Sequence, residues 1–291
     1  MTDRVGRQER GLGSLLAFAV GDALGASAEF MTPEEIKAAY GVHRDIIGGG
    51  WLKLEPGQIT DDTEMMLCVA RSLVACGGYN LPDIAAHFVE WYNSEPLDIG
   101  RTVSIGINRH IRTGRLEAPY AEDSAGNGGV MRALPLILAY ADQPETMQQA
   151  VVEQSRLTHN NEESDEGCRC YASLVAAALQ GADKQRLLEI ARRYPRFEPG
   201  KFDGKSGGYI VDTLRTVLHG FFVTDSLEGC IVTVTANGGD ADTTAALAGG
   251  LAGAYYGVGA IPDRWLKTLD VQVRAKIESF SPGLSRFLQK Y

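Results

Sequence analysis

The segment that most restricts the fold is 240–256, DADTTAALAGGLAGAYY, which is typical of a helix built largely from Ala and Gly. Small side chains let a helix approach its neighbours closely, as a helix at the centre of a bundle must. Gly238 and Gly239 directly before it permit a tight turn. We therefore expect this segment to be a central helix that other helices surround.

Helical periodicity also dominates the rest of the chain. Apolar residues recur at helical spacing in the segments 11–30, 64–76, 81–92, 129–140, 145–157, 166–180, 184–193 and 209–222. Only CIVTVTAN, residues 230–237, resembles a strand, and it is short. The sequence predicts an all-α protein with one core, and we expect residues 1–291 to form a single domain.

Composition excludes several classes of function. A formal net charge of -9 argues against a protein that binds nucleic acid by neutralising phosphates. The five cysteines form no CxxC pair, and most lie in apolar helical patterns, which fits a reduced cytoplasm. The N-terminus lacks the layout of a secretion signal, and no apolar run reaches the roughly 20 residues that span a bilayer.

Two irregular segments, 114–129 and 192–208, are longer than usual connections between helices. Long loops in compact domains are more often functional than accidental. The second segment carries a local excess of Arg and Lys in an otherwise acidic protein. It is either a solvated, mobile loop or a lid that faces an anion.

Two clusters of carboxylate and threonine side chains stand at expected helix starts. GQITDDTEMM places Thr60 beside Asp61 and Asp62, and NGGDADTTAA places Thr243 after Asp240 and Asp242. Either cluster alone could be ordinary helix capping. If the two helix starts face each other, four carboxylates would repel one another unless cations lay between them. Oxygen donors select hard ions, so we expect two divalent cations, Mg²⁺ or Mn²⁺.

Further carboxylates occur near these motifs. Asp22 and Glu29 are seven residues apart, which would place them on one face of an apolar helix. Asp22 could instead cap a neighbouring segment, and Glu29 could simply end the helix. Asp98 follows Pro96 in an expected loop, with the same ambiguity.

Three polar or aromatic features are candidates for ligand binding. SAGNGGVMR, which contains Gly126, Asn127 and Gly128, is a Gly-rich turn that leads into an expected helix and could present N–H groups to phosphate. His159 is either a cap at a helix end or a ligand contact. Tyr209 follows two glycines and is either a core aromatic, which the sequence favours, or a platform for stacking.

The motifs together resemble those of the ADP-ribosylglycohydrolases. The resemblance rests on these segments in this order: GDALGASAEF, GQITDDTEMM, PLDIG, GNGGVMR, LTHN, GGYIVDTL and GGDADTTAALAGGLAGAYYG. It implies an all-α fold around a dinuclear Mg/Mn centre, and removal of ADP-ribose from an arginine side chain.

The resemblance also implies roles for individual residues. Glu29 and Asp98 match the acidic residues assigned to catalysis. The matching positions for ADP-ribose binding are Gly126, Asn127, Gly128, His159 and Tyr209. The metal ligands match Thr60, Asp61, Asp62, Asp240, Asp242 and Thr243.

Within the family, the sequence around and between these motifs is most similar to that of the glycohydrolases that act on dinitrogenase reductase. This similarity implies ADP-ribosylated dinitrogenase reductase as the substrate, control by a PII-type signalling protein, and regulated association with a membrane surface. Three alternatives stay open: an ADP-ribosyl hydrolase with other substrates, a metal-dependent phosphohydrolase, and a non-catalytic relative like the lens crystallins of this fold.

Overall fold

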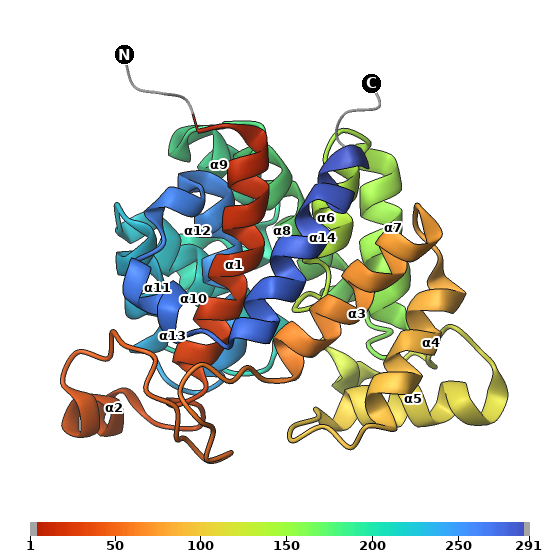
Figure 1. The fold of residues 1–291 in the computed structure, drawn as a ribbon, viewed down its shortest axis with the longest axis horizontal. Coiled ribbons are helices and arrows are strands. Elements are labelled where there is room, and N and C mark those ends of the chain that lie inside the picture. Colours follow the sequence, from red (N-terminus) through yellow and green to blue (C-terminus); the bar gives the residue numbers. More distant parts are fainter. Residues whose placement is uncertain (1–4, 288–291) are drawn as a thin grey trace.

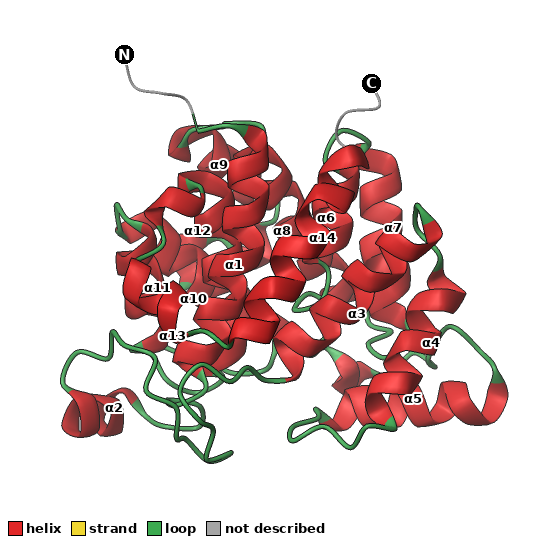
Figure 2. Ribbon diagram, in the orientation of Figure 1, coloured by secondary structure: helices red, strands yellow, loops and turns green. Residues whose placement is uncertain are grey.

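The computed structural model describes residues 5–287, and these residues form helices joined by loops and turns (Figure 2). Within this range, extended pairing is limited to two isolated backbone bridges, Gly49 with Leu54 and Gly126 with Tyr209. The all-α prediction is confirmed. The α-helices are α1 (Arg7–Gly25), α2 (Pro33–Tyr40), α3 (Asp61–Cys76), α4 (Leu81–Tyr92), α5 (Arg101–Thr113), α6 (Leu134–Tyr140), α7 (Pro144–Arg156), α8 (Glu162–Leu179), α9 (Lys184–Ala191), α10 (Ile210–Val223), α11 (Leu227–Thr235), α12 (Ala241–Tyr256), α13 (Asp263–Thr268) and α14 (Val271–Phe287).

The Ala- and Gly-rich helix α12 packs against α1, which lies between α12 and α14 (Figure 1). Their backbones are so close that side chains cannot fit at several points. A Cβ atom on Gly249 would lie 2.0 Å from the Ala17 carbonyl oxygen, and one on Gly21 would lie 2.1 Å from that of Ala245. The expectation that 240–256 packs closely against its neighbours is confirmed.

The contacts between α1 and α12 define an antiparallel register. Gly253 meets Gly13 at one end of the pair, and Gly25 meets Ala241 at the other, with close contacts every four residues between them. Residues four apart lie on one face of a helix, so each helix presents one stripe of small residues to the other. The C-terminal end of α1 is thereby fixed beside the first turn of α12.

Three expected elements differ from the structure. Residues 230–237, read as a possible strand, lie mostly in helix α11. Ser226 caps this helix by accepting a hydrogen bond from the Gly229 amide at 3.0 Å. Leu227, Cys230 and Val234 are buried at helical spacing. Packing against α12 therefore overrides the β propensity of the local sequence.

The helix expected over 11–30 ends at Gly25, so Asp22 lies in the helix and Glu29 in the turn that follows. The Phe30 amide donates to the Gly239 carbonyl at 2.6 Å instead of continuing the helix. The placement of Asp22 and Glu29 on one helical face is therefore wrong.

The helix expected over 129–140 begins only at Leu134. Residues 127–133 form tight turns, in which the amides of Val130 and Met131 both donate to the Asn127 carbonyl. Helices α2, α5, α13 and α14 lie outside the segments expected from periodicity.

Ion pairs connect the basic segment 192–208 to helix α8. It contains two short 3₁₀ helices, Pro195–Phe197 and Pro199–Lys201. Arg196 forms ion pairs with Glu163 and Glu166 on α8, and Lys201 donates to the Pro195 carbonyl at 2.8 Å.

All five cysteines are free. Among residues 5–287, none of the helices is both long and apolar enough to cross a membrane.

The contact between α1 and α12 generates a stability prediction. In an ordinary helix interior, replacing Gly by Ala stabilises by about 1 kcal/mol. In Gly249→Ala the new methyl group would overlap the backbone of α1, so we expect a loss of about 2 to 3 kcal/mol in the free energy of unfolding.

The matched control is Gly11→Ala in α1, where the nearest atom to the added methyl would be a Leu138 side-chain carbon at 3.6 Å. This substitution should be neutral or stabilising in urea unfolding. Equal stability of the two variants would contradict the close packing of the helices.

Candidate functional site

A cavity of about 570 Å³ opens where the end of α1 meets the first turns of α3, α5 and α12. Segments 126–128 and 207–208 also line it. Six carboxylates line it: Glu29, Asp61, Asp62, Asp98, Asp240 and Asp242. The two motifs expected to face each other do so, because the α1–α12 register places both helix starts at the same end of the bundle.

Asp22 fixes the start of α3. Its buried carboxylate accepts hydrogen bonds from the Thr60 amide at 3.0 Å, from the Thr63 amide at 3.1 Å and from the Thr63 hydroxyl at 2.5 Å. These amides would otherwise be unpaired donors at the helix N-terminus. Asp22 is therefore a cap on a neighbouring segment, and this cap ties α1 to α3.

Asp62 joins the two helix starts. Its Oδ2 atom lies 3.1 Å from the Thr243 hydroxyl of α12 and 3.4 Å from the Thr60 hydroxyl, and both can donate to it. Its Oδ1 atom is buried and has no hydrogen-bond partner. Since a buried, unpaired carboxylate oxygen is costly, this atom suits a cation ligand.

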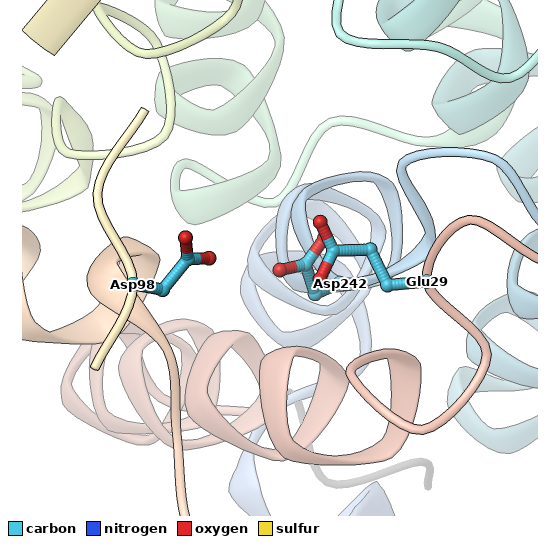
Figure 3. Close-up of side chains that lie close together, drawn as sticks. All are labelled: Glu29, Asp98 and Asp242. Carbon is cyan, nitrogen blue, oxygen red and sulfur yellow. The ribbon is translucent and has the colours of Figure 1, made fainter. Parts of the chain in front are cut away.

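Glu29, Asp98 and Asp242 form a second focus of negative charge (Figure 3). One oxygen from each lies within 4.8 Å of the other two, a separation that a single ion could bridge. Glu29 and Asp98 approach from opposite sides, with Asp242 beside Glu29 (Figure 3). The two carboxylates assigned to catalysis by the resemblance are thus close to those assigned to metal binding.

The surroundings of the cavity carboxyl groups disfavour their ionised form unless a cation is bound beside them. Burial, with repulsion among the carboxylates, raises the pKa of Asp61, Asp62 and Asp242 well above the usual range. Burial raises the pKa of Glu29 to about 8 and also raises that of Asp98. None of the ion pairs among residues 5–287 involves the six carboxylates. Divalent cations would supply the missing positive charge.

The Gly-rich turn and His159 form one wall of the cavity. The imidazole lies so close to the turn that a Cβ atom on Gly128 would be 2.5 Å from it, and one on Gly126 would be 3.0 Å. Gly128 is therefore needed to admit the ring, and a side chain at Gly126 would require the ring to shift by a few tenths of an ångström. The side-chain Nδ2 atom of Asn127 donates to Asp240 Oδ2 at 2.6 Å, which connects this wall to the carboxylates.

His159 is buried and neutral. Burial, with the nearby Arg132 charge, lowers its pKa to about 3. Its Nδ1 atom lies 2.7 Å from the Thr158 hydroxyl, which accepts from Arg132 at 2.8 Å. His159 thus lines the cavity as a ligand contact would, held by neighbours that the sequence did not single out.

Two expected site residues lie beside the cavity rather than along it. Thr60 is buried beneath it and contacts Asp62. Tyr209 is 42% exposed, so it is not the core aromatic that the sequence favours. Its hydroxyl donates to Glu163 Oε2 at 2.6 Å, while the preceding Gly207 and Gly208 line the cavity.

Several residues of the cavity wall were not expected from the sequence, among them two aromatic residues and an arginine. Phe30 and Trp51 lie at its margin, and Arg101 stands at the start of α5. Phe30 ends the segment 11–30, whose helical periodicity gave no sign of a cavity, and Trp51 has no helical or strand periodicity around it. The signal for Trp51 was the run of three glycines before it, at residues 48–50.

Known proteins share this architecture and sequence. The family model described as ADP-ribosylglycohydrolase matches residues 3–290. The ADP-ribosyl-dinitrogen reductase glycohydrolase of Rhodospirillum rubrum is 48% identical over 275 residues, 92% of this chain and 93% of that protein. The ADP-ribosylarginine hydrolase Tri1 of Pseudomonas putida is 33% identical over 89% of this chain and 74% of its own. A solved ADP-ribosylglycohydrolase-related protein complex matches with a TM-score of 0.85 and 36% identity, covering 97% of this chain and 98% of that one.

The buried carboxylates generate a prediction for the metal-free protein. Raised pKa values mean that the folded chain keeps protons that the unfolded chain has already released, so the free energy of unfolding should fall as pH rises. The fall should begin near pH 4, where unfolded carboxyl groups titrate, and extend to about pH 8, where Glu29 does.

Urea unfolding in chelator at a series of pH values tests this prediction. We expect a loss of at least about 2 kcal/mol between about pH 5 and pH 8, and a smaller loss in Asp62→Asn, which cannot ionise at that position. Stability that rises with pH in the metal-free protein would contradict the electrostatic description.

Proposed function

The chain belongs to the ADP-ribosylglycohydrolase family, and we propose that it hydrolyses the N-glycosidic bond between ADP-ribose and an arginine side chain of a protein. The observation that carries this proposal is the cavity in which six carboxylates face a wall of Gly126, Asn127, Gly128 and His159. The proposed protein substrate is ADP-ribosylated dinitrogenase reductase, by analogy with the relative from Rhodospirillum rubrum.

The proposed cofactors are two divalent cations, Mn²⁺ or Mg²⁺. Their proposed ligands are Thr60, Asp61, Asp62, Asp240, Asp242 and Thr243. The unpaired Asp62 Oδ1 atom and the all-oxygen donor set support this assignment. When bound, such cations would neutralise the clustered carboxylates and polarise oxygen atoms of the substrate.

The chain's own groups provide the remaining functions. We assign substrate binding to the wall of Gly126, Asn127, Gly128 and His159, where a neutral imidazole and backbone amides avoid adding charge beside the carboxylates. The side chain of Tyr209 is exposed beyond this wall. We propose that the base of ADP-ribose stacks on it.

Asp98 and Glu29 are the proposed catalytic residues. Hydrolysis breaks the bond between the ribose anomeric carbon and the arginine nitrogen, adds the water oxygen to that carbon and returns a proton to the guanidine nitrogen. Asp98 lies in a loop and is half-buried, so its carboxylate can take the proton from water without being enclosed. Glu29, on the opposite side, is the second candidate for this transfer (Figure 3).

Regulation belongs to the same proposal. If dinitrogenase reductase is the substrate, control by a PII-type signalling protein and association with a membrane surface would accompany it. Binding of the purified chain to a PII-type protein, measured with and without nucleotide, tests this part separately.

A direct assay tests the proposed function. Incubation with ADP-ribosylated dinitrogenase reductase, beside an ADP-ribosylarginine peptide, should release intact ADP-ribose in the presence of Mn²⁺ and none in chelator. Release of phosphate, or of AMP, would indicate a phosphohydrolase instead. A preference for the protein over the peptide would support the proposed target, whereas equal rates would indicate a general ADP-ribosylarginine hydrolase.

Asp98→Asn tests the assignment of proton transfer. The substitution keeps the size of the side chain and removes the base, so kcat should fall by about 10² to 10⁴ while Mn²⁺ and ADP-ribose still bind. Turnover at the normal rate would transfer the role to Glu29. Loss of bound Mn²⁺ would place Asp98 among the metal ligands, an arrangement that its proximity to Asp242 would allow.

A further inference from the structure

Two exposed aromatic side chains stand at the margin of the cavity. Phe30 is 67% exposed and Trp51 is 50% exposed, and both line the cavity beside Glu29. Their ring centroids are 5.5 Å apart and the ring planes are tilted by 49°. Aromatic rings left open to solvent at a cavity form a surface on which a flat ligand group can stack.

Trp51 is positioned by a side-chain hydrogen bond and by the contacts of its loop. Its indole Nε1 atom donates to Glu29 Oε2 at 2.5 Å, so the edge of the ring meets the carboxylate while half of the side chain stays exposed. The preceding glycines at 48–50 all have positive φ, and Gly49 exchanges two backbone hydrogen bonds with Leu54, at 2.7 and 2.9 Å. A Cβ atom on Gly50 would lie 2.4 Å from the Ala26 carbonyl oxygen, so the loop sits directly on the turn after α1.

Phe30 is held in a conformation that large residues rarely adopt. Its φ is 62°, in the left-handed region, and its amide is fixed by the Gly239 carbonyl at 2.6 Å. Strained backbone of this kind occurs most often at ligand-binding sites, where surrounding contacts maintain it. The side chain gains little burial in return, which points to a use outside the core.

The charges around the cavity distinguish its two sides. Among the described residues that line it, Arg101 is the only Lys or Arg, and it stands at the start of α5, next to the loop of Asp98. Glu29 faces Asp98 across the site (Figure 3). Phe30 follows Glu29 in the chain, and Trp51 donates a hydrogen bond to it, so the aromatic pair belongs to the side of Glu29. An anionic pyrophosphate is therefore favoured near Arg101, and a cation near the aromatic pair.

We propose that Phe30 and Trp51 form the subsite for the guanidinium group of the arginine that carries ADP-ribose. This inference rests on the proposed function and specifies how the protein side of that substrate is recognised. A guanidinium plane stacks on aromatic rings and is attracted by their faces, and the Glu29 carboxylate adds favourable charge beside them. Trp51 is in addition a positioning residue for Glu29, through the indole N–H.

Binding of matched ligands tests the subsite without requiring turnover. The ligands are ADP-ribose, a carbon-linked ADP-ribosylarginine analogue that cannot be hydrolysed, and the same analogue with a neutral urea in place of the guanidinium. Calorimetry on the Mn²⁺-loaded protein should show a preference for the guanidinium analogue over the urea analogue.

Phe30→Ala and Trp51→Ala should each reduce that preference by about 3- to 30-fold, the range of one cation–π contact, with ADP-ribose affinity changed less than about twofold. Phe30→Leu, which keeps apolar volume without the ring face, should show the same reduction and guards against misfolding. Tyr120→Ala, at an exposed aromatic outside this cavity, is the control and should match the wild type.

Trp51→Phe separates the two roles of Trp51. It keeps an aromatic face and loses the N–H to Glu29, so the guanidinium preference should persist while kcat for ADP-ribosylarginine falls and its pH profile shifts. An equal loss of ADP-ribose affinity in the alanine variants would identify a nucleotide platform and overturn the proposal, as would an unchanged guanidinium preference. A wild-type protein that prefers the guanidinium analogue but releases no ADP-ribose would retain the subsite and contradict the proposed function.

Discussion

The close antiparallel contact between α1 and α12 is the constraint on which the rest of the structure depends. Gly21 and Gly249 lie against carbonyl groups of the opposite helix, so no side chain separates the two backbones. The register of this contact places the turn after α1 beside the turn before α12. Glu29, from the first, and Asp242, from the second, reach the same cavity only because these two helix ends are fixed together.

The cavity concentrates charge that the chain alone does not neutralise. Hydroxyl groups of Thr60 and Thr243 can donate to Asp62, and Asn127 donates to Asp240, but these groups are neutral. Arg132 is buried nearby, yet its hydrogen bonds go to Gln154 and Thr158. The packing of α1 on α12 must therefore offset the cost of burying the carboxylates until cations bind.

Helical periodicity and the two Asp-rich motifs were sufficient to predict the helical fold and the meeting of α3 and α12. Local sequence was insufficient where distant contacts decide the structure. The Gly239 carbonyl diverts Phe30 from the helix, and this contact moves Glu29 into a turn. Packing against α12 makes residues 230–235 helical. Trp51 could not be assigned to the cavity because its hydrogen bond to Glu29 depends on the shape of the loop.

Manganese stoichiometry tests the central claim, that opposing helix starts create a site for two divalent cations. The measurement is a calorimetric titration of chelator-treated protein with Mn²⁺, with elemental analysis of the product and Asp62→Asn as the comparison. We expect two ions bound per chain, and at least one lost in the variant with its helical content unchanged. A wild-type chain that binds no Mn²⁺, or a variant that binds two ions as tightly as the wild type, would contradict the account.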